Sequence, residues 1–147
     1  MKLLKIVWNA PNTIIGFIVL LFLFLLKEIK NVFIENGALI CVLRGKTTNK
    51  CLQMFFESNM SASIGNLVFI SQSKLLKQKF LAHEIAHVQQ SEVLGVFYFP
   101  FYTICYLIIY VIGQGDPKFD HPLEIMARRK AGQIIDILGA IQKLKQK

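Results

Sequence analysis

The sequence predicts an α+β protein, in which an N-terminal apolar helix is followed by one small domain of short strands and further helices. The chain has 147 residues, enough for a single domain. Apolar residues make up 54% of it and charged residues 18%, whereas soluble domains average about 45–50% and about 25%. This composition excludes a disordered chain and indicates contact with a membrane. Short apolar stretches bounded by polar turns occur together with segments of helical periodicity, as in α+β folds.

The N-terminal helix is predicted to be a membrane anchor formed by residues 1–30. Residues 6–26 carry no charge, and a helix of this length covers about 30 Å, the thickness of the hydrocarbon core. A cleaved signal peptide is the competing interpretation, but the apolar block runs into charged residues without a small-residue cleavage pattern. The sequence therefore favours an uncleaved transmembrane helix. Pro11 indicates that its continuous part begins near Asn12, with Trp8 at the membrane interface.

Residues 31–147 are predicted to form the folded domain, which begins with a short antiparallel sheet. Apolar stretches at 38–44 and 51–56, separated by a polar turn, predict a hairpin. Residues 67–70 predict a third strand.

Two helices are expected after the sheet. Ser73 is a suitable N-cap for a helix over residues 74–94, which carries apolar residues at helical spacing. The last helix is expected to start after Asp120 or His121, with Pro122 in its first turn, and to run to the lysine-rich C-terminus.

A second uncharged run, residues 93–115, lies between these helices, and by length alone it would be a spanning helix. Pro100 lies inside it, and all four tyrosines of the protein recur within it at a spacing of four: Tyr98, Tyr102, Tyr106 and Tyr110. Tyrosines that anchor a membrane span gather at its ends. The stripe therefore indicates a face that packs on the rest of the protein.

Residues 83–87 read His-Glu-Ile-Ala-His, an HExxH motif inside the predicted helix. His83 and His87 are four residues apart and lie one above the other on a helix, so both can bind one zinc ion at about 2.0–2.1 Å. Glu84 then lies where a general base takes a proton from the attacking water. Two of the three histidines of the chain belong to this motif, which favours a metal site over two structural histidines.

A catalytic zinc needs three protein ligands and an open position. The position six residues beyond His87, where a longer form of the motif has a histidine, is Val93. The third ligand is therefore expected after the second apolar run, where the candidates are Asp116, Asp120, His121 and Glu124. A carboxylate such as Glu124 is also favoured by the helix dipole in the first turn of a helix, without any metal.

The string HEIAHVQQ at 83–90, the strand that begins after Gly65 and the string Glu-Ile-Met-Ala at 124–127 resemble compact zinc peptidases of the gluzincin class, near the small membrane-associated HExxH peptidases. The resemblance covers about residues 63–131 and implies a minimal zincin-like domain that hydrolyses peptide bonds in a peptide or protein substrate. The roles it implies are Zn²⁺ ligands at His83, His87 and Glu124, and a general base at Glu84.

One position departs from the pattern of this class. Arg128 stands where many relatives carry an aspartate that orients a histidine ligand. The residue that orients the histidine ligands is therefore unassigned, and Asp120 and His121 are the candidates for that role.

A shared zinc site constrains the second apolar run. If residues 93–115 crossed the bilayer once, His87 and Glu124 would be about 30 Å apart and could not bind one ion. We therefore expect this segment to be a re-entrant or interfacial hairpin, broken at Pro100.

The net charge of +8 is distributed unevenly, because fifteen of the seventeen basic residues follow the uncharged run 6–26. This places the catalytic domain on the cytoplasmic face of the membrane, in agreement with three cysteines that form no CxxC pair. The basic residues are dispersed, so membrane lipid and a peptide or protein substrate are the expected partners, and nucleic acid is not. The alternative function is a non-catalytic membrane adaptor or assembly protein with a structural or degenerate zinc site, which a fourth protein ligand would favour.

Overall fold

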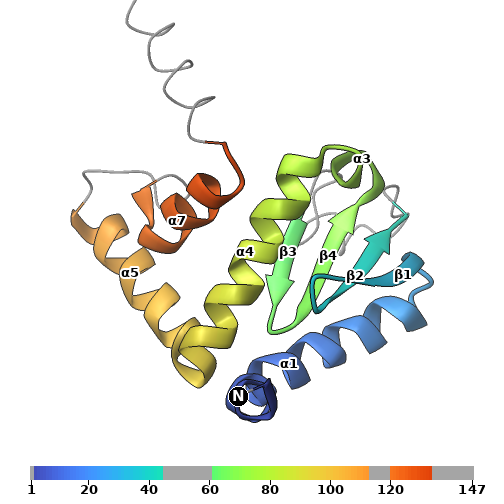
Figure 1. Cartoon of the computed structure of the whole chain (residues 1–147), viewed down its shortest axis with the longest axis horizontal. Coiled ribbons are helices and arrows are strands. Elements are labelled where there is room, and N and C mark those ends of the chain that lie inside the picture. The colour runs from blue at the N-terminus through green and yellow to red at the C-terminus, as the bar shows by residue number, and fades with distance from the viewer. Residues whose placement is uncertain (1, 45–60, 113–119, 134–147) are drawn as a thin grey trace, which may run out of the picture.

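The computed structural model describes residues 2–44, 61–112 and 120–133, and these form an α+β fold (Figure 1). The predicted α+β class with an N-terminal apolar helix is confirmed. In chain order the elements are α1 (Lys2–Leu25), β1 (Ile29–Glu35), β2 (Ala38–Leu43), β3 (Ser61–Ile64), β4 (Leu67–Ser71), α3 (Gln72–Leu75), α4 (Gln78–Leu94), the 3₁₀ turn η1 (Gly95–Phe97), α5 (Tyr98–Ile112) and α7 (Pro122–Lys130).

The four strands form one mixed sheet in the order β1-β2-β4-β3. β2 and β4 are parallel neighbours, whereas β1 pairs with β2 and β3 pairs with β4 in antiparallel fashion. The prediction of an antiparallel sheet is therefore wrong. Burial explains the order: every residue of β4 and most residues of β2 are buried, so these two strands occupy the centre, and the more exposed β1 and β3 lie at the edges.

The predicted hairpin between 38–44 and 51–56 involves residues 45–60, which lie outside the described residues. Within the described chain the hairpin partner of β2 is β1, a strand that the sequence analysis assigned to the end of the anchor and the residues after it. Asn36 and Gly37 make the turn between them, with φ angles of 50° and 83°. Asn-Gly is a common choice for a two-residue hairpin turn, because both residues tolerate positive φ.

The sheet separates two apolar clusters, because alternate residues of a strand point to opposite faces. On one face, Ile40, Val68 and Ile70 pack against Leu81, Ile85 and Val88 of α4. On the other face, Cys41, Leu67 and Phe69 pack against Leu23 of α1. Figure 1 shows α1 and α4 on the two sides of the sheet, so the core has three layers.

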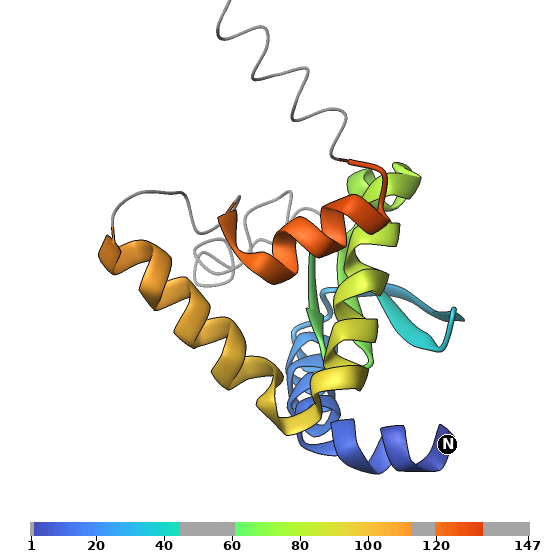
Figure 2. The same cartoon turned by 60° about the vertical axis from the view of Figure 1, so that its left-hand side comes forward.

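Two helices, α1 and α4, begin at residues other than those predicted. α1 begins at Lys2 rather than near Asn12 and contains Pro11; Figure 2 shows its first turns, in dark blue, at an angle to the rest. α4 begins at Gln78, and Ser73 is not its N-cap but a residue of the short helix α3.

The second apolar run is broken at Gly95, not at Pro100. Gly95 has a φ of 54°, and a side chain there would collide with the indole of Trp8, so glycine is required at this turn. Pro100 lies in the first turn of α5, where the missing N–H has no helical partner anyway. Figure 2 shows α5 leaving the end of α4 at a sharp angle.

α7 returns to pack on α4 (Figure 2). It begins at Pro122 with His121 as its N-cap, so the predicted start of the last helix is confirmed. The predicted continuation into residues 134–147 lies outside the described residues.

Two stretches, Val7–Leu25 and Gln78–Val111, are long and apolar enough to cross a membrane, which indicates membrane association.

Candidate metal centre

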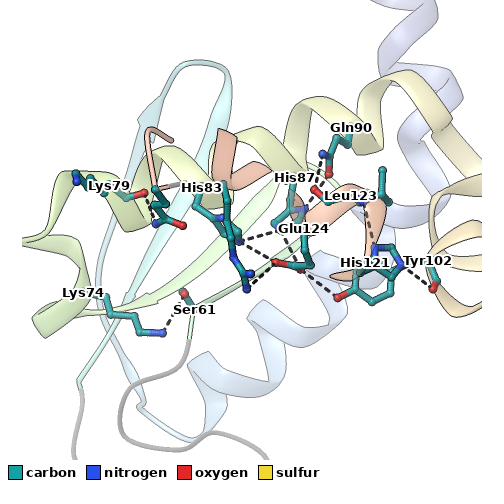
Figure 3. Close-up of polar contacts among 12 residues, drawn as sticks. Ser61, Lys74, Lys79, His83, His87, Gln90, Tyr102, His121, Leu123 and Glu124 are labelled. Atoms are coloured by element: carbon teal, nitrogen blue, oxygen red, sulfur yellow. Dashed lines mark hydrogen bonds and ion pairs between the residues drawn. The ribbon is translucent and has the colours of Figure 1, made fainter. Parts of the chain in front are cut away.

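Three side chains predicted as metal ligands meet between α4 and α7 (Figure 3). The Nε2 atoms of His83 and His87 are 3.1 Å apart. The carboxylate of Glu124 lies 3.3 Å from His83 Nε2 through Oε2 and 3.2 Å from His87 Nε2 through Oε1. All the ligand atoms lie within 4.8 Å of one another.

These separations fit a single small ion. Ligand atoms bound tetrahedrally at about 2.0–2.1 Å lie about 3.3 Å from one another. The three measured separations are 3.1, 3.2 and 3.3 Å. His83, His87 and Glu124 are thus placed closely enough to hold a metal ion.

Hydrogen bonds and charges within the cluster favour a protonated His87 beside an ionised Glu124. Burial would raise the pKa of Glu124, but hydrogen bonds from His83 and His87 outweigh it and hold that pKa well below its ordinary value. Burial would lower the pKa of His87, but Glu124 outweighs it and raises that pKa. A metal ion bound here therefore replaces a proton shared between imidazole and carboxylate.

Glu84 is buried beside the cluster, with 5% of its surface exposed. Burial raises its pKa, and the neighbouring His87 and a hydrogen bond from the Ser61 hydroxyl offset part of this effect. Ser61 in turn accepts a hydrogen bond of 3.3 Å from Lys74 Nζ (Figure 3). A carboxylate with a raised pKa and a fixed orientation is suited to accept and return a proton.

Gln90, which the motif does not include, orients His87. Its Oε1 lies 2.8 Å from His87 Nδ1, and its Nε2 donates to the carbonyl of Leu123 at 2.9 Å. With Nε2 of His87 free to bind a metal, Nδ1 carries the hydrogen that Gln90 accepts, which fixes the tautomer and the ring orientation. Of the two candidates for this role, His121 does not take it, because both of its ring nitrogens bind backbone groups. The available signal was the position of Gln90, three residues after His87 on the same helix face.

His121 and Tyr102 hold Glu124 in place. His121 Nδ1 accepts from the N–H of Leu123 at 3.2 Å, and its Nε2 donates to the carbonyl of Tyr102 at 3.0 Å. The two rings are stacked, with centroids 4.1 Å apart. The hydroxyl of Tyr102 then donates to Glu124 Oε1 at 3.1 Å.

Of the four candidates for the third ligand, the structure brings only Glu124 into the described cluster. Both ring nitrogens of His121 are engaged elsewhere. Asp120 is exposed and outside the cluster, and Asp116 lies outside the described residues.

Arg128 lies one turn after Glu124 on α7, with Nη2 4.0 Å from Glu124 Oε2. An arginine at this distance pairs with the ligand carboxylate and cannot accept from a histidine, as an aspartate would. His83 Nδ1 is buried and, among the described residues, has no hydrogen-bond partner.

The cluster opens into a cavity of about 440 Å³ between β3, α4, α5 and α7. Glu84 lines the same cavity as the three ligands. The lining residues outside the cluster include Ser61, Ala62 and Ser63 of β3 and Tyr98, Phe99 and Tyr102 of α5.

Comparison of the chain with protein-family models, with curated proteins and with solved structures gave no match.

Proposed function

We propose that the protein is a membrane-associated zinc metallopeptidase that hydrolyses peptide bonds. The observation that carries this proposal is the convergence of two imidazole nitrogens and one carboxylate on a single point at the wall of an open cavity. Nitrogen and oxygen ligands in this number are those of catalytic zinc, which keeps a fourth position open. Zinc held by His83, His87 and Glu124 would polarise the substrate carbonyl and lower the pKa of the attacking water.

Glu84 is the general base of the proposed reaction. It takes a proton from the attacking water and delivers it to the leaving amine. Its burial supports this role, because the raised pKa makes the protonated form accessible between the two transfers. The Ser61 hydroxyl holds the carboxylate toward the cavity.

Strand β3 supports a peptide as the substrate. It lies at the edge of the sheet and pairs on one side with β4, and within the described chain no strand pairs with its other side. Its residues line the cavity together with the metal cluster. An extended peptide that added to this edge would run past the ligands with its backbone hydrogen-bonded.

A catalytic site is favoured over the structural site that a membrane adaptor would carry. A closed structural site needs a fourth protein ligand, for which Asp120 and His121 were the candidates. Both nitrogens of His121 already have partners, and Asp120 is outside the cluster. The excess of basic residues after α1 supports a position of the catalytic domain on the cytoplasmic face.

The test compares purified wild-type protein with Glu84→Gln, His87→Ala and Glu92→Gln. Glu84→Gln is expected to keep about one zinc per chain and to lose peptide hydrolysis, because an amide cannot accept the proton. His87→Ala is expected to lose both. Glu92 is on the same helix but does not line the cavity, so Glu92→Gln serves as the matched control. Full hydrolysis by Glu84→Gln would remove Glu84 from the mechanism, and full zinc content in a His83→Ala/His87→Ala variant would overturn the metal assignment.

A further inference from the structure

One face of α1 is packed on the sheet over most of the helix. Leu23 is 2% exposed and lies in the apolar cluster under the sheet, joined by Val19 and Leu20. A side chain added at Gly16 would come within 2.6 Å of the carbonyl oxygen of Ile64, so the helix backbone lies directly on the turn between β3 and β4.

Buried polar side chains fasten the first half of α1 to the end of α4. Asn12 donates to the carbonyl of Gly95 at 2.6 Å and to Asn9 Oδ1 at 2.9 Å. The hydroxyl of Ser91 donates to the same Asn9 oxygen at 2.7 Å. Trp8 Nε1 also donates to the carbonyl of Val93 at 3.2 Å. The helix is therefore a layer of the domain along its length, not a stalk that leads away from it.

This packing is incompatible with a transmembrane orientation of α1. Residues 12–26 lie beside the sheet and cover about 22 Å, roughly three quarters of the hydrocarbon core. If α1 stood across the bilayer, the sheet would be in hydrocarbon with it. The edge strand β1 would then expose Lys30, Asn31 and Glu35 to lipid, and neither an open sheet edge nor unpaired charges are tolerated there.

The opposite face of α1 is apolar and exposed. Its exposed large side chains include Ile14, Ile18, Leu21, Phe22 and Leu25.

The apolar surface continues onto α5. Trp8 of α1 contacts Phe97 of η1, with ring centroids 5.9 Å apart. The exposed residues of α5 that extend the surface include Phe101, Ile104, Leu107, Ile108, Tyr110 and Val111. Figure 1 shows the two helices meeting near the N-terminus and diverging from there.

We propose that the protein is monotopic: α1 lies along one leaflet of the bilayer without crossing it, and the outer faces of α1 and α5 together form its lipid-binding surface. The partner is the headgroup and acyl-chain boundary of a phospholipid leaflet, which accepts an apolar face with Trp and Tyr among its side chains. The surface extends over two helices that are joined through Trp8 and Phe97. Because Tyr98, Phe99 and Tyr102 of α5 also line the cavity, the candidate metal centre lies next to the lipid.

The test places single cysteines at Lys2 and at Lys27, which lie at the two ends of α1, in a chain whose Cys41, Cys51 and Cys105 are replaced. Right-side-out and inside-out membrane vesicles are treated with an impermeant maleimide, and detergent-solubilised protein gives total labelling. A monotopic chain labels both positions in the same kind of vesicle and protects both in the other. Labelling of Lys2→Cys in one kind of vesicle and of Lys27→Cys in the other would overturn the proposal.

A second measurement tests the surface itself with purified protein and vesicles of neutral and anionic phospholipid. The variant Ile18→Glu/Leu21→Glu is expected to bind at least about tenfold more weakly, because charges are costly in the apolar part of a leaflet. Ile125→Glu, on the exposed side of α7, is the matched control and is expected to bind as the wild type does. Circular dichroism establishes that the variants are folded. If the wild type forms a detergent-free dimer that does not bind vesicles, a second copy covers this surface and the proposal is wrong.

Discussion

Gln90 gives the sharpest test of whether the cluster is built to hold a metal. Gln90→Leu keeps a side chain of similar size but removes the acceptor 2.8 Å from His87 Nδ1 and the donor 2.9 Å from the Leu123 carbonyl. His87 Nδ1 then keeps only the longer contact of 3.4 Å with the Tyr98 hydroxyl. The less constrained imidazole can rotate, or place its hydrogen on Nε2 and lose the lone pair that a metal needs. We expect zinc affinity to fall about 10–100-fold, as for other partners that orient a histidine ligand.

The structure supports this magnitude. The loss corresponds to about 1.4–2.7 kcal/mol, and two hydrogen bonds of ordinary length contribute about 1–3 kcal/mol net. His87 is 5% exposed, so water cannot easily replace the missing acceptor, and the Tyr98 hydroxyl lies farther from Nδ1 than Gln90 does, at 3.4 Å.

The assay is competition for zinc with a chromogenic chelator. Gln89→Leu is the matched control, because Gln89 is the neighbouring residue but accepts from Lys130 and does not contact the cluster. Gln90→Glu keeps an acceptor for His87 and loses the donor to Leu123, so its affinity is expected to lie between that of the wild type and that of Gln90→Leu. If Gln90→Leu binds zinc within about twofold of Gln89→Leu, Gln90 does not orient a ligand and the reasoning is refuted.

Three further predictions concern pH, the third ligand and the packing of α1. In the zinc-free fold, Glu124 raises the pKa of His87 above the value that His87 has in the unfolded chain. The pairing of the two side chains therefore stabilises the fold fully at pH values below the unfolded-state pKa. This stabilisation is lost as pH rises through the folded-state pKa. The thermal unfolding temperature of zinc-free protein should therefore fall as pH rises above the ordinary histidine pKa of about 6.5, while that of zinc-loaded protein should not; parallel curves would contradict this. Tyr102→Phe removes a donor to Glu124 and should weaken zinc binding about tenfold in the chelator assay, and an unchanged affinity would show that the hydroxyl is not needed. Asn12→Ala leaves the Gly95 carbonyl without its side-chain donor and should lower the free energy of unfolding in detergent by about 1–3 kcal/mol. Exposed Ile15→Ala is its control, and equal effects of the two would contradict the role of the buried amide.

The part of the site that is local in sequence could be predicted. His83, Glu84 and His87 lie on one helix, and their spacing alone determines their relative positions. Glu124 was one of four candidates, and the resemblance, not the spacing, selected it. Gln90 was missed because its second hydrogen bond goes to Leu123, 33 residues later, and its role depends on where the first turn of α7 packs.

The sheet, like the site, could be predicted only where the signal is local in sequence. Four consecutive apolar residues at 67–70 predicted a strand, and such a run is typical of one covered on both faces, as β4 is. The residues of a strand do not indicate whether the neighbouring strands run parallel or antiparallel to it, so the parallel pair β2–β4 could not be predicted. β1 was missed because Lys27, Glu28 and Lys30 were interpreted as the flank of an anchor, although Asn36 and Gly37 marked the hairpin turn.

α1 shows which information a mean hydropathy leaves out. The mean hydropathy of a segment reflects how many of its residues are apolar, but not on which face of the helix the few polar residues lie. Asn9, Asn12 and Gly16 recur at i, i+3 and i+7, which places two amides and a site of close approach on one side of the helix. In lipid those amides would lack partners, whereas against a folded domain they find Ser91 and the carbonyl of Gly95. An apolar helix with polar and small residues on a single face is therefore better interpreted as a layer of the domain than as a free span.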